Sequence, residues 1–134
     1  MEEQKHNPAV LLFQVRDPLR AARIGSYLQR RSIRLIEVGE EDLHRSIGEL
    51  LGIPGTERRQ FRCCEQVMEE EMLVMFAFQG TMMKDFLQFF RDEGLTPVAL
   101  KAVATPTNIF WSAQELYAEL SKEREYFRSR ETKR

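Results

Sequence analysis

The sequence has few of the features that mark membrane or exported proteins. Its longest unbroken apolar run is seven residues, Met72 to Phe78, which is too short to span a bilayer and long enough for one buried strand. The charged N-terminus is not followed by the apolar core of an export signal. We therefore expect a cytoplasmic protein without a membrane segment.

Cysteine is also scarce, because the chain contains only two, the adjacent pair Cys63 and Cys64. Disulfides normally join residues well apart in sequence, so we expect two free thiols. A metal site is not indicated, since there is no second cysteine pair and His6 and His44 lie far from this one. No neighbouring base marks a catalytic thiol. We expect no metal and no cofactor.

Net charge is nearly absent, with 20 basic and 21 acidic residues giving a formal charge of -1. No bulk attraction to nucleic acid or to an anionic membrane follows from this balance. The local exception is a basic cluster in and around the first predicted helix, and RNA binding through it is one alternative. We favour a solvated helix face balanced by the acidic segments 40–42 and 69–71, so nucleic acid is not the expected partner. The basic residues are Arg16, Arg20, Arg23, Arg30, Arg31 and Arg34.

A strand–helix–strand–helix pattern is present, and it occurs twice. The patterning predicts strands at 9–15, 33–38, 71–78 and 97–104, and helices at 17–31, 40–51, 81–94 and 112–128. We expect one domain over residues 9–128, made of two halves (9–51 and 71–127) joined by a loop. The flanking residues 1–8 and 129–134 are polar and are predicted to be a disordered start and tail.

The first and third predicted strands are the most apolar, so we expect them at the centre of the sheet with both faces covered and the other two at the edges. Two topologies fit. One is an α+β fold, a four-stranded mixed sheet of the ferredoxin-like split βαβ type with extra helices, in which the third strand runs antiparallel to the first. The other is an α/β four-stranded parallel sheet with right-handed crossovers. The duplication and the long connection at 52–70 favour the mixed sheet.

The most distinctive residues follow the fourth predicted strand. They place an ammonium group, hydroxyl groups and an amide close to a helix N-terminus, an arrangement that can bind phosphate or carboxylate. The structural alternative, which turn preferences favour, is that these side chains cap the turn, staple the last helix and protect an edge strand. The candidate ligand-binding residues are Lys101, Thr105, Thr107, Asn108 and Trp111.

The same residues carry a resemblance. Lys101 to Val103, Thr105 to Asn108 and Trp111, with Leu116 and Tyr117 in the following helix, resemble the hallmark of an uncharacterised bacterial family, domain-of-unknown-function family 3783. The resemblance covers mainly residues 71–123. It implies a place to look for a site and no reaction, because the family has no established activity.

Catalytic motifs are missing, since the chain has no G-x-S-x-G, Walker, G-x-G-x-x-G or H-E-x-x-H pattern. We therefore lean against an enzyme and expect a non-enzymatic binding or regulatory module. Self-association, or binding of another protein, is predicted because the sheet is very apolar for the size of the chain and a partner would cover one face. A small anionic ligand or an enzymatic site at the Thr105–Asn108 turn is the alternative.

Overall fold

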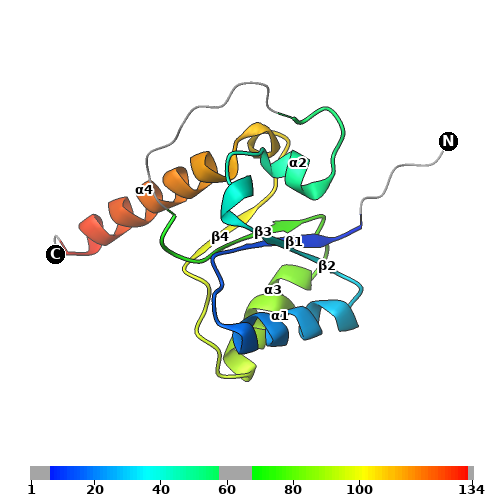
Figure 1. Cartoon of the computed structure of the whole chain (residues 1–134). Helices are drawn as coiled ribbons and strands as arrows, with labels where there is room; N and C mark the ends of the chain where they lie inside the picture. The colour runs from blue at the N-terminus through cyan, green and yellow to red at the C-terminus, as the bar shows by residue number, and fades with distance from the viewer. Residues whose placement is uncertain (1–6, 58–67, 133–134) are drawn as a thin grey trace.

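The computed structural model describes residues 7–57 and 68–132, which form a four-stranded sheet between two layers of helices (Figure 1). The strands are β1 (Ala9–Phe13), β2 (Arg34–Val38), β3 (Met72–Phe76) and β4 (Leu100–Val103). The α-helices are α1 (Pro18–Arg30), α2 (Ile47–Leu51), α3 (Met82–Asp92) and α4 (Ala113–Thr132). Two short 3-10 helices are η1 (Glu40–Asp42) and η2 (Asn108–Phe110).

The sheet has the order β2-β1-β3-β4 and is mixed. Strand β1 runs parallel to β2 and antiparallel to β3, which in turn runs parallel to β4. The predicted mixed sheet is confirmed, and the all-parallel alternative is wrong. Within each half the two parallel strands are direct neighbours. The two strand–helix–strand units therefore lie side by side along the β1–β3 ladder and do not interleave, so the ferredoxin-like split βαβ arrangement expected for this mixed sheet is not formed.

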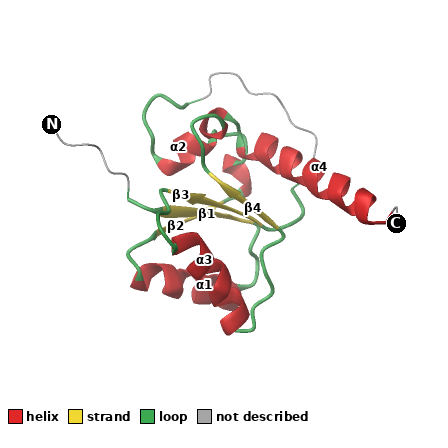
Figure 2. Ribbon diagram, turned by 180° about the vertical axis from the view of Figure 1, so that it is seen from behind, coloured by secondary structure: helices red, strands yellow, loops and turns green. Residues whose placement is uncertain are grey.

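The central strands are covered on both faces, as predicted. Helices α1 and α3 lie against one face and α2 and α4 against the other (Figure 2). Alternation along β1 sends Val10 and Leu12 into the α1–α3 core and Leu11 and Phe13 into the α2–α4 core. Because the chain supplies a helix layer for each face, the reason that the sequence offered for self-association, an uncovered face, does not hold for the described residues.

Both central strands end two residues earlier than predicted, for the same physical reason. Gln14 follows β1 with φ 65°, and Ala77 follows β3 with φ 62°. A left-handed residue cannot continue an extended ladder. Equivalent hydrogen bonds recur after the helices, where Ile33 N donates to Leu28 O (2.9 Å) and Leu95 N donates to Phe90 O (2.8 Å). The predicted duplication is therefore visible in the backbone.

The two halves are related by an approximate two-fold axis perpendicular to the sheet. At three levels a residue in one half meets its own counterpart in the other. Leu11 pairs with Val74 in the sheet, the rings of Tyr27 and Phe89 lie 4.4 Å apart between α1 and α3, and an isolated antiparallel bridge joins Ser46 to Ser112. The β1–β3 ladder, the α1–α3 layer and the α2–α4 layer are thus centred on one line.

The second predicted helix is interrupted. Its apolar residues Leu43, Ile47 and Leu51 are buried as expected, but the continuous helix from residue 40 to 51 is wrong. Between η1 and α2, Ser46 is extended (φ -72°, ψ 155°). This conformation lets it bridge to Ser112 while its hydroxyl caps α2, and an unbroken helix would permit neither.

Other boundaries also differ. Helix α4 continues to Thr132, where a disordered tail from Ser129 was expected, and it projects beyond the sheet (Figure 1). On α3, Met83 is 42% exposed, and the half-buried Phe89 packs on the α1–α3 core. The expected disorder of residues 1–6 and the Cys63–Cys64 pair fall outside the described residues.

Candidate functional site

The predicted ligand-binding turn is closed by its own hydrogen bonds. The Thr105 hydroxyl accepts from the backbone N–H of Thr107 (3.3 Å) and of Asn108 (3.0 Å). The Asn108 side chain accepts from Thr105 N (2.9 Å) and donates to Val103 O (3.0 Å). The N–H groups that an anion would use are therefore already donating within the turn, and the capping interpretation of these residues fits the geometry better.

Lys101 and Trp111 lie apart from these turn contacts. Lys101 sits on the edge strand β4 and donates from Nζ to Val98 O at 3.0 Å. Trp111 is half-buried against the α2–α4 core, and its carbonyl accepts from Ile47 N at 2.9 Å. The structure thus brings Thr105, Thr107 and Asn108 together, while Lys101 and Trp111 serve the strand edge and the joint between the halves.

The arginines do not form one basic stripe, because several have intramolecular partners. Arg20 makes a bidentate pair with Glu71 (2.8 and 2.7 Å), and Arg34 donates to Leu51 O at 3.0 Å. Arg31 stacks over the Tyr27 ring, 3.8 Å from its centroid. The predicted balancing of the first helix by segment 69–71 is confirmed for the Arg20–Glu71 pair.

Two consecutive glutamates at the start of β3 tie the helix layers of both faces to the sheet. Glu71 pairs with Arg20 of α1, and Glu70 makes a bidentate pair with Arg124 of α4. The Tyr117 hydroxyl oxygen accepts from Glu69 N (3.2 Å) and Glu70 N (3.3 Å). The sequence predicted the balancing of the first helix by segment 69–71, but it did not reveal the contacts of Arg124 and Tyr117, because these partners are about fifty residues apart and no local pattern links them.

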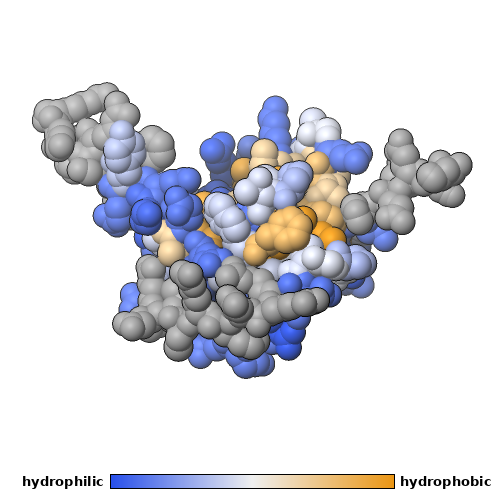
Figure 3. Space-filling model, turned by 90° about the horizontal axis from the view of Figure 1, so that it is seen from above, coloured by the Kyte–Doolittle hydropathy of each residue, from blue (hydrophilic) through white to orange (hydrophobic). Residues whose placement is uncertain are grey.

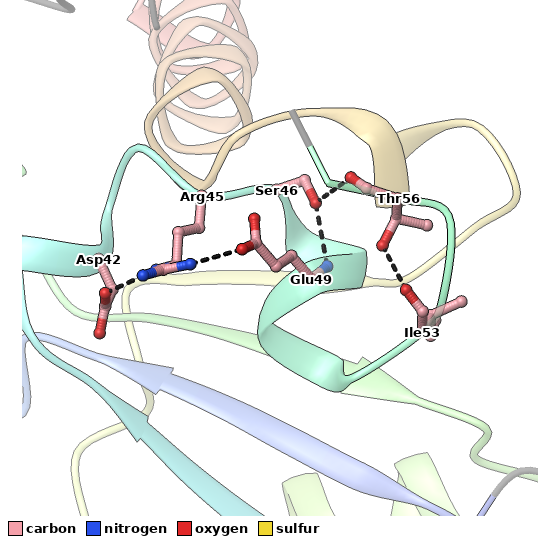
Figure 4. A network of polar contacts seen from close by, with 6 residues as sticks. All are labelled: Asp42, Arg45, Ser46, Glu49, Ile53 and Thr56. Carbon is pink, nitrogen blue, oxygen red and sulfur yellow. Dashed lines mark hydrogen bonds and ion pairs between the residues drawn. The ribbon is translucent and has the colours of Figure 1, made fainter. Parts of the chain in front are cut away.

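A second polar network holds the short helix α2 (Figure 4). Arg45 bonds Asp42 at 2.8 Å and Glu49 at 2.5 Å. The buried Ser46 hydroxyl accepts from Glu49 N (2.9 Å) and donates to Thr56 O (2.5 Å). The Ser46 hydroxyl thereby joins the N-terminus of α2 to the segment that follows the helix, at Thr56. The network stabilises the local fold and does not form a binding site.

The α2–α4 face also carries apolar side chains, which gather near its middle among hydrophilic residues (Figure 3). Phe110 of η2 is 52% exposed, and η2 lies against α2. Exposed apolar side chains are normal on protein surfaces. This surface by itself does not define a site.

The clearest candidate site in the described residues is a groove of about 560 Å³ between α1 and α3. Its floor is aromatic, formed by Tyr27 and Phe89. One wall is basic and the other acidic, because α1 has no acidic residue. The charged residues of the groove are Arg23, Arg30 and Arg31 on the α1 side and Asp85, Asp92 and Glu93 on the α3 side.

The two walls face each other in antiparallel register. Arg23 lies level with Glu93, at 3.5 Å, and Tyr27 lies level with Phe89. At the far end, Arg31 and Asp85 both act on the Tyr27 hydroxyl. Burial raises the pKa of Tyr27, while Arg31 lowers it and Asp85 raises it further. Each cation of the basic wall therefore has a carboxylate near its own level on the acidic wall.

These opposite charges remain largely uncompensated within the chain. The Arg23–Glu93 contact is exposed at both ends (56% and 50%). Asp85 accepts from the Thr81 hydroxyl and Asp92 from the Gln88 amide, and neither forms an ion pair with another described residue. The sequence alone did not reveal the groove, although the absence of carboxylates from α1 was a signal that its charges need partners elsewhere.

Residues 7–57 and 68–132 hold neither a metal-ligand cluster nor a membrane-spanning helix. They contain no group of three or more histidine, cysteine or carboxylate side chains placed to hold a metal ion. Within the same ranges, no helix has the length and apolar character needed to cross a membrane.

Residues 71–127 match the model of a protein family described as Domain of unknown function (DUF3783). The resemblance drawn from the Lys101-to-Trp111 segment is confirmed by this match, which spans β3, α3, β4 and most of α4. Comparisons with curated proteins and with solved structures gave no match. The acidic wall of the groove thus lies in the matched half and the basic wall outside it.

Proposed function

We propose that this chain, whose residues 71–127 match the model of the DUF3783 family, is a non-enzymatic binding module that contacts another protein through the groove between α1 and α3. The observation that supports this function is the separation of charge across the groove. Arginines line one wall and carboxylates the other, and a single exposed ion pair joins them. Self-association is the assembly that we expect, in the cytoplasm of a bacterial cell.

A protein partner suits this groove better than a small molecule. Small-molecule pockets enclose their ligand with mainly apolar walls. Here the walls are formed by long charged side chains, and Arg23, Arg30 and Asp92 lie in exposed positions. Charged residues around a narrow aromatic floor resemble the rim and centre of a protein interface, where charge complementarity guides association and selects the partner.

Sedimentation velocity of the full chain would test this proposal, over about 10 to 500 µM protein and at about 0.05 and 0.5 M salt. We expect reversible association that weakens as salt rises, because screening reduces contacts between exposed charges. A chain that stays monomeric over the whole range, at both salt concentrations, would contradict self-association.

A further inference from the structure

We infer that the groove-bearing face of α1 and α3 packs against the same face of a second copy, related by a two-fold axis that runs along the groove. This inference rests on the proposed function and specifies its partner. In the arrangement, α1 of each copy lies over α3 of the other. The observation that carries it is the level-by-level match of opposite charges on two antiparallel helices.

The direction of the helices follows from the sheet. Strand β1 is antiparallel to β3, and each helix returns between two parallel strands of its own half. Helices α1 and α3 are therefore antiparallel, and both lie on the same face (Figure 2). The Arg23–Glu93 and Tyr27–Phe89 contacts fix which residues share a level.

A two-fold rotation about a line along the groove exchanges the two walls. It keeps each residue at the same position along the groove. The basic wall of one copy then faces the acidic wall of the other. Arg23 of one copy lies over Glu93 of its partner, and Arg30 and Arg31 lie over Asp85, with the reciprocal contacts repeated at the same time. Such an interface is self-complementary, as two-fold interfaces require.

The alternative stacking of α1 on α1 is disfavoured, because it sets arginines against arginines and carboxylates against carboxylates. The two-fold along the groove is the arrangement in which every charged level meets its opposite. It also sets the two aromatic floors opposite each other, each with the rings of Tyr27 and Phe89 4.4 Å apart. The groove charges that form no ion pair among the described residues of one copy thereby gain a partner.

A complementation experiment tests the contact. Arg30→Glu and Asp85→Arg each place a like charge opposite the partner wall, so each variant alone is expected to associate at least about tenfold more weakly than the wild type. An equimolar mixture restores both contacts and is expected to form a mixed dimer. Arg16→Glu, at an exposed position outside the groove lining, is the matched control and leaves association unchanged.

A charge-swapped chain tests the geometry. The variant Arg23→Glu/Arg30→Glu/Arg31→Glu/Asp85→Lys/Asp92→Lys/Glu93→Lys exchanges the signs of both walls, so it pairs with itself but presents like charges to the wild type. Native mass spectrometry of a mass-labelled mixture is expected to show both homodimers and no mixed dimer.

Free mixing of the swapped chain with the wild type would overturn the arrangement and leave self-association intact. Loss of association in the swapped chain, with a folded chain shown by circular dichroism, would also overturn it. If the swapped chain does not fold, the Arg30→Glu and Asp85→Arg mixture decides, and its failure to form a mixed dimer contradicts the inference. A wild-type chain that stays monomeric would refute the proposed function itself.

Discussion

The first half of the molecule carries a helix α1 without carboxylates and a helix α2 of five residues that ends at Gly52. The second half carries the acidic side of the groove on α3 and a helix α4 of 20 residues. Yet the backbone plan of the two halves is the same, down to the left-handed residue after each central strand. Strand pairing and caps thus set the common plan of the two halves, while the groove-lining sides of α1 and α3 carry opposite charge.

The caps show both the likeness and the difference. Ser46 and Ser112 each accept the N–H of a glutamate three residues later, at 2.9 and 3.0 Å. Only Glu115 returns the contact, through its side chain to Ser112 N (2.9 Å). Only Ser46 also holds a neighbouring loop, at Thr56. Equivalent positions therefore offer matched variants, one in each half.

The largest expected difference concerns the core positions Phe86 and Ile24, which occupy equivalent sites on α3 and α1. Both are fully buried. Phe86 also packs against the rings of Tyr27 and Phe90 at 5.5 and 5.4 Å. We expect Phe86→Ala to lower the free energy of unfolding by about 3–5 kcal/mol, and Ile24→Ala by less, about 2–3 kcal/mol. Urea unfolding followed by circular dichroism measures both, and a larger loss for Ile24→Ala would contradict the packing described.

The next largest difference in stability is expected between variants of the two N-cap serines, Ser46 and Ser112. Ser46→Ala removes a cap and leaves the carbonyl of the buried Thr56 without its donor, so we expect a loss of about 2–3 kcal/mol. Ser112→Ala removes a cap alone, at a cost of about 1 kcal/mol. Thermal and urea unfolding of the two variants compare these costs. Equal losses would mean that the Thr56 contact adds no stability.

Gly48 and its counterpart Gln114 test the close packing of the first half. A Cβ at Gly48 would lie 2.6 Å from the Thr56 side chain, so Gly48→Ala must displace the loop and is expected to cost about 1–3 kcal/mol. Gln114 already has a Cβ, and Gln114→Ala should stay within about 0.5 kcal/mol of the wild type. A neutral Gly48→Ala would show that Thr56 can move away freely.

Variants in the turn before η2 distinguish between its structural and its ligand-binding interpretation. Asn108→Ala removes two hydrogen bonds and should cost about 1–2 kcal/mol, whereas Thr107→Ala should cost less than about 0.5 kcal/mol. Phosphate, the probe for an anion site, should leave the melting temperature of the wild type unchanged. Stabilisation by phosphate that disappears in Lys101→Ala would instead support a ligand at this turn.

The smallest effect concerns the paired rings Tyr27 and Phe89, of which only one carries a hydroxyl. Burial raises the pKa of Tyr27 above its ordinary value, with Arg31 opposing and Asp85 adding to the shift. The Tyr27 hydroxyl therefore loses its proton at a lower pH in the unfolded chain than in the folded chain. Its contribution to the free energy of unfolding is complete below about pH 10 and is lost as the pH rises through the folded pKa. Tyr27→Phe should therefore make the alkaline decline shallower. Urea unfolding between about pH 8 and pH 11 measures the slope, and an unchanged slope would contradict the burial of this hydroxyl.

Much of the fold was predictable, because its central strands carry continuous apolar runs that indicate burial on both faces. The break between η1 and α2 was not, since the residue that requires it, Ser46, finds its partner Ser112 only in the folded chain. The same limit applies to the site. The turn residues were recognised as a group, with both interpretations open, because they are close in sequence. The groove was missed because its walls come from different halves.

Amide hydrogen exchange on the full chain most directly tests whether the two halves fold as one body around the β1–β3 ladder. The paired amides of β1 and β3 are expected to exchange slowest and with the same free energy of opening, equal to that of global unfolding, while β2 and β4 exchange faster. If amides of one central strand opened at much lower free energy than those of the other, the halves would be separate units, and the shared axis would not describe the molecule.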